Sequence, residues 1–102
     1  MQQIEILVIG RYKKIMEILL RHISANENWH ATPAWSVEEA HLLFEQKTFS
    51  IVLLSSGFDE IVEKNLTAYF KAVRPSTEVV LHYGGGTGLF YNEIYAAIEK
   101  II

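Results

Sequence analysis

The chain of 102 residues contains no cysteine. This absence excludes disulfides, thiolate metal sites and cysteine nucleophiles, and it fits a reducing compartment. The chain also lacks a sustained basic run and has a net charge of −3, which argues against a nucleic-acid binder that relies on phosphate contacts. No apolar run reaches the length of a membrane span, and the N-terminus has no signal-peptide pattern. We therefore expect a cytoplasmic protein that contacts neither membrane nor nucleic acid.

What is present suits one compact globular domain over residues 1–102, because half of the residues are hydrophobic and 21% are charged. Strand and helix patterns alternate four times without a linker. Strands are predicted at residues 4–9, 29–35, 49–55 and 78–83, and helices at 11–25, 36–47, 59–73 and 89–102. Four such units in succession predict a parallel sheet with helices on both of its faces.

Local signals refine this outline. Pro33 predicts that the second strand lies at an edge of the sheet, since proline removes a backbone donor. Ser36 and Glu39 form a capping box at the start of the second helix. The first helix is expected to bury a stripe of Ile15, Leu19 and Ile23, and the third to turn inward Ile61, Leu66, Tyr69, Phe70 and Val73. The glycine-rich run 84–88 is expected to be a loop.

Four stretches together resemble a known family. They are residues 6–9 as first strand, 36–40 at the start of the second helix, 49–54 as third strand and 95–102 as last helix. In this order and spacing they resemble a response-regulator receiver domain, the flavodoxin-like module of two-component signalling. The resemblance implies a three-layer α/β/α sandwich with strand order 2-1-3-4, in which the fifth strand is missing or replaced.

The departures from the family decide the functional prediction. The acidic pair that holds Mg²⁺ in receivers matches Gly10 and Arg11, and the phospho-accepting aspartate matches Ser55. A cation there repels a divalent metal, and a serine without an adjacent base is a poor acceptor. The family's hydroxyl residue after the fourth strand matches Tyr83 or Gly84, and the lysine of a fifth strand has no match. We therefore expect no metal, no cofactor, no phosphotransfer and no enzymatic activity.

The same edge of the sheet offers a candidate anion site. Carboxyl ends of parallel strands meet there, and backbone N–H groups before a helix favour negative charge. The candidate residues are Arg11, Ser55, Ser56, Gly85, Gly86, Thr87 and Gly88. The alternative is that the glycines only permit a tight turn and that the two serines satisfy nearby backbone. His82, near this edge, fits a strand histidine with a partner better than a catalytic one, and Asp59 fits a helix cap.

The last helix carries more apolar residues than one face requires, and the fourth strand is expected to be an open edge. The candidate interface residues are Phe90, Tyr91, Tyr95 and Ile102. They favour a protein partner, with a homodimer as the leading form. The alternative is that the helix folds across the open edge and buries its additional apolar residues there. The leading prediction is thus a non-catalytic, phosphorylation-independent interaction module. The alternative is a domain that binds a small anion or metabolite at the carboxyl edge.

Overall fold

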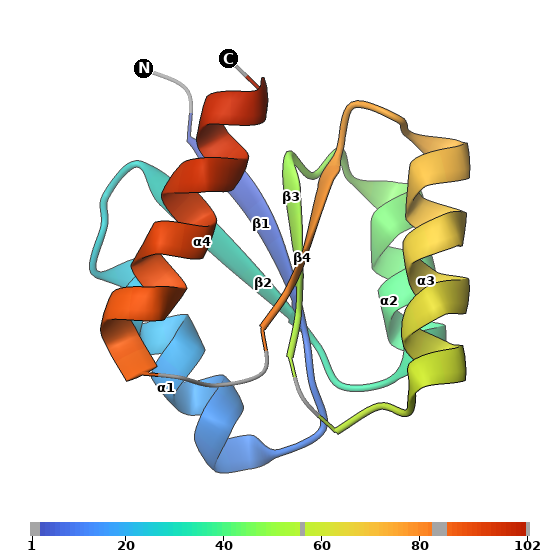
Figure 1. The fold of residues 1–102 in the computed structure, drawn as a ribbon, viewed down its shortest axis with the longest axis horizontal. Helices are drawn as coiled ribbons and strands as arrows, with labels where there is room; N and C mark the ends of the chain where they lie inside the picture. Colours follow the sequence, from blue (N-terminus) through green and yellow to red (C-terminus); the bar gives the residue numbers. More distant parts are fainter. Residues whose placement is uncertain (1–2, 56, 83–85, 102) are drawn as a thin grey trace.

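The computed structural model describes residues 3–55, 57–82 and 86–101. Its elements are β1 (Ile4–Ile9), α1 (Lys13–Ser24), β2 (Trp29–Ala34), α2 (Val37–Gln46), β3 (Ile51–Leu54), α3 (Glu60–Val73), β4 (Glu78–Leu81) and α4 (Gly86–Ile101). The four strands pair in parallel in the order β2-β1-β3-β4 (Figure 1). This order and the flavodoxin-like α/β class confirm the prediction from the sequence.

Two helix layers enclose the sheet. Figure 1 shows α1 and α4 on one side of the strands and α2 and α3 on the other. Because side chains alternate along a strand, Ile6 and Val8 of β1 pack in the cluster with α1 and α4, whereas Leu7 and Ile9 pack in the cluster with α2 and α3. The strands β1 and β3 are therefore apolar on both faces, which explains their uninterrupted hydrophobic runs.

Two helices bury a face turned slightly from the predicted one. Helix α1 buries Met16, Leu19 and Ile23, while Ile15 is exposed. In α3 the inward stripe consists of Glu63, Leu66 and Phe70. The predicted inward positions Ile61, which is 72% exposed, and Val73, also exposed, are wrong. The prediction failed because it used apolar residues alone to find the buried side of α3. Glu63 lies on that side, and its carboxylate made the position look exposed.

The helix starts follow the predicted caps. The Glu39 N–H donates to Ser36 Oγ at 3.1 Å. In return, the Glu39 carboxylate accepts from the Trp35 N–H at 2.7 Å, one residue earlier than in a standard capping box. At the start of α3 the Asp59 carboxylate accepts from the Val62 N–H at 2.9 Å, which confirms Asp59 as a cap.

Helix α4 begins earlier than predicted. It starts at Gly86, so residues 86–88 are helical and the predicted loop is wrong at these three positions. Glycine disfavours helix by about 1 kcal/mol, but Phe90, Ile94 and Ala97 pack into the core and tertiary packing outweighs propensity. Residues 83–85 lie outside the described residues.

The side of the sheet that α4 covers bears on the missing fifth strand. A right-handed crossover from β4 to a strand beyond it requires a helix on the face of α2 and α3. Helix α4 instead packs with α1 on the opposite face. Within the ranges that the structure describes, the sheet therefore ends at β4. In those ranges no helix is long and apolar enough to cross a membrane.

Candidate functional site at the carboxyl edge of the sheet

The strand register brings three sequence-predicted positions side by side. The Ser55 N–H donates to the Ile9 carbonyl at 2.8 Å, and the His82 N–H donates to the Leu54 carbonyl at 2.9 Å. Gly10, Ser55 and His82 therefore follow the carboxyl ends of β1, β3 and β4. The residue beside Ser55 on the fourth strand is thus His82. The two residues predicted from the resemblance for the hydroxyl position, Tyr83 and Gly84, lie outside the described residues.

At Gly10 the space for a side chain is occupied. A Cβ atom on this glycine would lie 2.5 Å from Met16 Sδ and 3.3 Å from Ser55 Cβ. Met16 is fully buried in the core between the sheet and α1, and its flexible thioether would have to move to admit a side chain at position 10. An acidic side chain at position 10 therefore does not fit without repacking of this part of the core.

Arg11 is exposed, but its side chain has a partner. The guanidinium carbon lies 5.0 Å from the centre of the Phe58 ring, a cation–π distance. The loop that carries Phe58 approaches closely, because a Cβ on Gly57 would lie 3.1 Å from the ring of Tyr12 and 3.3 Å from Arg11 Cβ. Gly57 has a φ of 111°, which favours glycine. The loops after β1 and β3 therefore close against each other around Arg11.

The predicted anion-binding residues are only partly brought together. Ser55 lies beside Gly10 but is 1% exposed, so its hydroxyl is not offered to solvent. Arg11 follows Gly10 on the same edge and lies over Phe58. Gly86, Thr87 and Gly88 form the first turn of α4, whereas Ser56 and Gly85 lie outside the described residues. At this edge Ser55 is buried and Arg11 is exposed, and anion binding here stays a prediction.

The carboxyl edge also contains a histidine–carboxylate pair. His82 is 5% exposed, and its Nδ1 lies 2.5 Å from Oε1 of Glu93 on α4. The Phe90 ring stands edge-on to the imidazole at 5.7 Å between ring centres. His82 therefore links the end of β4 to α4. This agrees with the prediction that His82 is a strand histidine with a partner. The sequence analysis missed Glu93, although this residue shares the inward stripe of α4 with Phe90 and Ala97.

Glu5 and Tyr69 have shifted pKa values. At the opposite end of β1, burial raises the pKa of the Glu5 carboxyl, but hydrogen bonds and charges from Lys47 and His30 outweigh burial and leave that pKa lowered. Burial and the nearby Glu45 carboxylate raise the pKa of the Tyr69 hydroxyl. Within the described residues, no three histidine or carboxylate side chains are grouped so that they can hold a metal ion.

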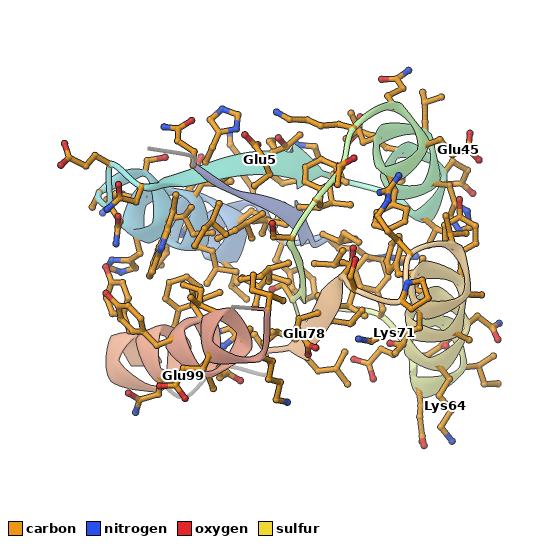
Figure 2. All side chains as sticks on the ribbon, turned by 90° about the horizontal axis from the view of Figure 1, so that it is seen from above. Glu5, Glu45, Lys64, Lys71, Glu78 and Glu99 are labelled. Atoms are coloured by element: carbon orange, nitrogen blue, oxygen red, sulfur yellow. The ribbon has the colours of Figure 1, made fainter. Side chains whose placement is uncertain are left out.

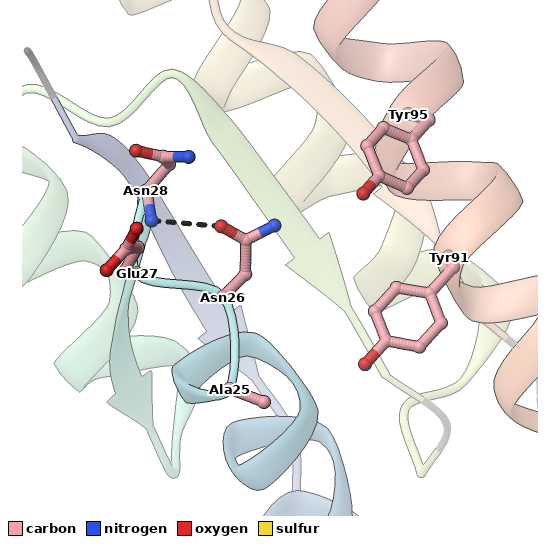
Figure 3. A pocket seen from close by; sticks show the side chains of 6 residues that line it. All are labelled: Ala25, Asn26, Glu27, Asn28, Tyr91 and Tyr95. Atoms are coloured by element: carbon pink, nitrogen blue, oxygen red, sulfur yellow. Dashed lines mark hydrogen bonds between the residues drawn. The ribbon is translucent and has the colours of Figure 1, made fainter.

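The predicted interface residues of α4 differ in their surroundings. Phe90 is 1% exposed and belongs to the core. Tyr91 is partly buried against the same core, while Tyr95 is 52% exposed and stands edge-on to Trp29 at 5.4 Å. Both tyrosines point across a cavity of about 760 Å³ toward the turn at Asn26 (Figure 3). Of this predicted set, Tyr95 is thus the residue that is well exposed; Ile102 lies outside the described residues.

A second apolar surface, which the sequence analysis did not single out, lies on α1 and the residue before it. Its members are Tyr12, Ile15 and Ile18, all exposed. Ile15 and Ile18 are three residues apart in α1 and therefore share one side of the helix, and Tyr12 is the extended residue directly before the helix. Lys13 and Lys14 lie between them and are also exposed. We call Tyr12, Ile15 and Ile18 the α1 patch.

Comparisons with known proteins agree with the fold. No family model and no curated protein matches the sequence. Among solved structures, the chain is similar to one in a crystal structure of the histidine kinase ThkA in complex with the response regulator protein TrrA. The TM-score is 0.73 at 17% identity, over 98% of this chain and 99% of that chain. It is also similar to a response regulator receiver protein from Pseudomonas putida, with a TM-score of 0.67 at 17% identity, over 95% of this chain and 81% of that chain.

The sheet topology and these likenesses together define the class of fold. The parallel sheet between two helix layers is a flavodoxin-like α/β fold. Within that class, both neighbours come from structures of response regulators, and the chain has the receiver-domain fold.

Proposed function

We propose that this chain is a receiver-like signalling module that binds a protein partner without phosphorylation and without catalysis. The observation that carries the proposal is the receiver fold with Gly10, Arg11 and Ser55 at its carboxyl edge. A magnesium ion in a phosphotransfer site requires carboxylate oxygens, and these three residues supply none.

The packing at Gly10 supports this proposal beyond the residue types. Met16 Sδ fills the volume that a side chain at position 10 would enter. Ser55 is buried, so an incoming phosphoryl donor does not reach its hydroxyl without local opening of the structure. This packing fits a chain that does not place a carboxylate at position 10.

The α1 patch is our candidate surface for the partner. An exposed apolar patch flanked by charges is typical of a protein interaction site. Lys14 is exposed and lies four residues before Ile18, on the neighbouring part of the helix surface, and its charge favours a partner with an acidic residue beside an apolar centre. One similar structure is described as a histidine kinase in complex with a response regulator, which supports a signalling protein as the partner class. We further propose a cytoplasmic location, which cell fractionation tests.

The phosphorylation-independent part is tested with intact-mass measurement and amide NMR. We expect no mass gain with acetyl phosphate and Mg²⁺, and no shifts at Gly10, Arg11 or Ser55 with beryllofluoride and Mg²⁺. A receiver domain that retains the acidic residues serves as the positive control. A phosphoryl adduct on this chain overturns the proposal. Saturable shifts with inorganic phosphate alone favour the alternative, a small-anion site.

The interaction part is tested by affinity capture from the native cytosol with mass-spectrometric identification. Ile18→Glu places a charge in the α1 patch, whereas Leu42→Glu places one on exposed α2. We expect the first variant to lose the captured protein at least 10-fold and the second to retain it. Equal capture by both variants contradicts the choice of surface.

A further inference from the structure

The outer edge of β4 carries backbone groups that point away from β3, and their positions follow from the register. The Glu78 N–H donates to the Ser50 carbonyl at 3.0 Å, and the His82 N–H donates to the Leu54 carbonyl at 2.9 Å. In a strand the N–H and C=O of one residue point to the same side and those of the next residue point to the other. Val79 and Leu81 therefore direct both groups away from β3. In the described part of the chain no strand pairs with them.

The surroundings of this edge are suited to a further strand. All four β4 residues are only partly buried, whereas all four of β3 are fully buried. A groove of about 490 Å³ lies between α3 and the end of β4. Small side chains, Thr67 and Ala68, line the middle of the groove. An added strand would thus find both hydrogen-bonding partners and a surface that it can cover.

We propose that a second copy of the chain occupies this edge, with the two β4 strands antiparallel about a two-fold axis at Val80. In this register Val79 forms a hydrogen-bonded pair with the partner's Leu81, and Leu81 with the partner's Val79. Each such pair exchanges two N–H···O bonds, so all four outward groups of each copy are satisfied. An axis at Val79 is inferior, because it opposes Leu81 to residue 77, and the Thr77 N–H already donates to the Arg74 carbonyl at 3.0 Å.

The charges of α3 favour a second copy over an unrelated strand. Helix α3 runs antiparallel to β4, because Lys71 near its end donates to the Thr77 carbonyl at 2.8 Å while Glu60 at its start lines the groove with Leu81. Its first turn is acidic and its last turn is basic. Figure 2 shows Lys71 beside Glu78, with Lys64 further along the same helix.

A two-fold axis at Val80 places the two α3 helices antiparallel on the same face of the joined sheet. The acidic start of one helix then lies toward the basic end of the other, and the helix dipoles oppose each other. The small residues Thr67 and Ala68 face the line between the helices, where they allow close approach. Glu60 pairs with Lys64 at 3.1 Å and Lys71 lies 3.7 Å from Glu78 within each copy, so the edge is self-complementary chiefly in its backbone groups, its helix dipoles and its shape.

The absence of cysteine from the sequence makes a sharp test possible. In the proposed register the two Val80 residues form a non-hydrogen-bonded pair with Cα atoms about 4.5 Å apart, within the range that a disulfide needs. Val79→Cys is the matched control in the same strand, because each Val79 lies diagonal to its copy at about 7–8 Å. Both variants are treated with oxidised glutathione after circular dichroism has confirmed their fold.

We expect the wild-type chain to be a dimer by light scattering at about 100 µM, a concentration that detects micromolar association. We expect Val80→Cys to form a covalent dimer at least 10 times faster than Val79→Cys. Equal rates for the two variants overturn the proposed register. A monomeric wild-type chain overturns the proposal whatever the cysteine variants do. Phosphorylation plays no part in this test, so its failure leaves the proposed partner binding intact.

Discussion

The two edges of the sheet, β2 and β4, differ in the backbone groups that they offer. In β2 the Gly10 N–H donates to the Ala34 carbonyl and the Ile4 N–H to the Asn28 carbonyl, so residues 29, 31 and 33 face outward. One of these is Pro33, which has no N–H, and the Trp29 N–H donates to the Asn26 carbonyl at 3.0 Å. Only Ala31 then directs a donor outward, whereas β4 directs two.

Side chains reinforce this difference. Glu5 of β1 lies 2.8 Å from His30 Nδ1 on β2 and 2.9 Å from Lys47 Nζ, so a charged cluster ties the start of β2 to β1. At β4 the comparable contact is looser, with Lys71 Nζ 3.7 Å from a Glu78 carboxylate oxygen. A proline in an outward position is a known protection against edge pairing. The comparison therefore indicates that β2 is a closed edge and that β4 is an edge open to a partner.

The largest expected difference between the two edge strands is in the free energy of unfolding after a histidine-to-alanine change in each. His82→Ala removes a buried ring from the end of β4 and leaves the Glu93 carboxylate without its partner. We expect a loss of about 3 kcal/mol in the free energy of unfolding. His30→Ala on β2 removes an exposed ring and should lose about 0.5 kcal/mol or less. Urea denaturation of both variants measures the difference, and equal losses contradict it.

A smaller effect is expected on the dissociation constant of the proposed dimer when a proline is placed in an outward position of β4, as Pro33 is in β2. Val79→Pro removes an outward N–H and leaves the bonds between β3 and β4 in place, because those use residues 78, 80 and 82. We expect the dissociation constant of the dimer to rise at least 10-fold, which is about 1.4 kcal/mol.

Sedimentation equilibrium measures this constant. Val79→Thr serves as the control, because it keeps the N–H and nearly the same shape, and it should dimerise like the wild type. Circular dichroism establishes that the proline variant is folded. A folded proline variant that dimerises as tightly as wild type excludes β4 as the paired edge.

The strands could be predicted from the sequence because two of them are apolar on both faces. Residues 51–54 form an unbroken apolar run, and in an α/β alternation such a run predicts a central strand. Pro33 correctly predicted that the second strand lies at an edge of the sheet. The register explains why, because the nitrogen of Pro33 faces outward, where no hydrogen bond to β1 is lost. Strand order followed from the resemblance to receiver domains and is confirmed.

Other features depend on contacts that composition does not reveal. Glu63 and Glu93 lie on the inward sides of their helices. A search for apolar residues cannot identify them as inward positions, because both are carboxylates. Met16 in the space beside Gly10 is a packing detail that only the folded chain shows. The outward direction of the Val79 and Leu81 groups depends on which alternate residues bond to β3. A strand prediction with ends uncertain by a residue does not fix that alternation.

The smallest expected effect concerns the charged cluster on the β2 side. The pKa of Glu5 is lowered from an ordinary value of 4.5, because Lys47 and His30 outweigh its burial. A carboxyl whose pKa is lowered in the folded state stabilises the fold above the unfolded-state value. That stabilisation is lost as the pH falls through the folded-state value. We therefore expect the cluster to contribute about 0.5 kcal/mol at pH 6 and progressively less as the pH falls below 4.5.

Glu5→Gln removes this dependence while keeping the side-chain volume. Wild type and variant should differ in the free energy of unfolding at pH 6 and converge as the pH falls below 4.5. Urea denaturation at several pH values follows the convergence, and addition of salt at pH 6 should reduce the difference because the cluster is partly exposed. Dimer formation should be unaffected at either pH, since the cluster joins β1 to β2 and includes no residue of β4. A change in association in Glu5→Gln contradicts the assignment of protection to one edge and pairing to the other.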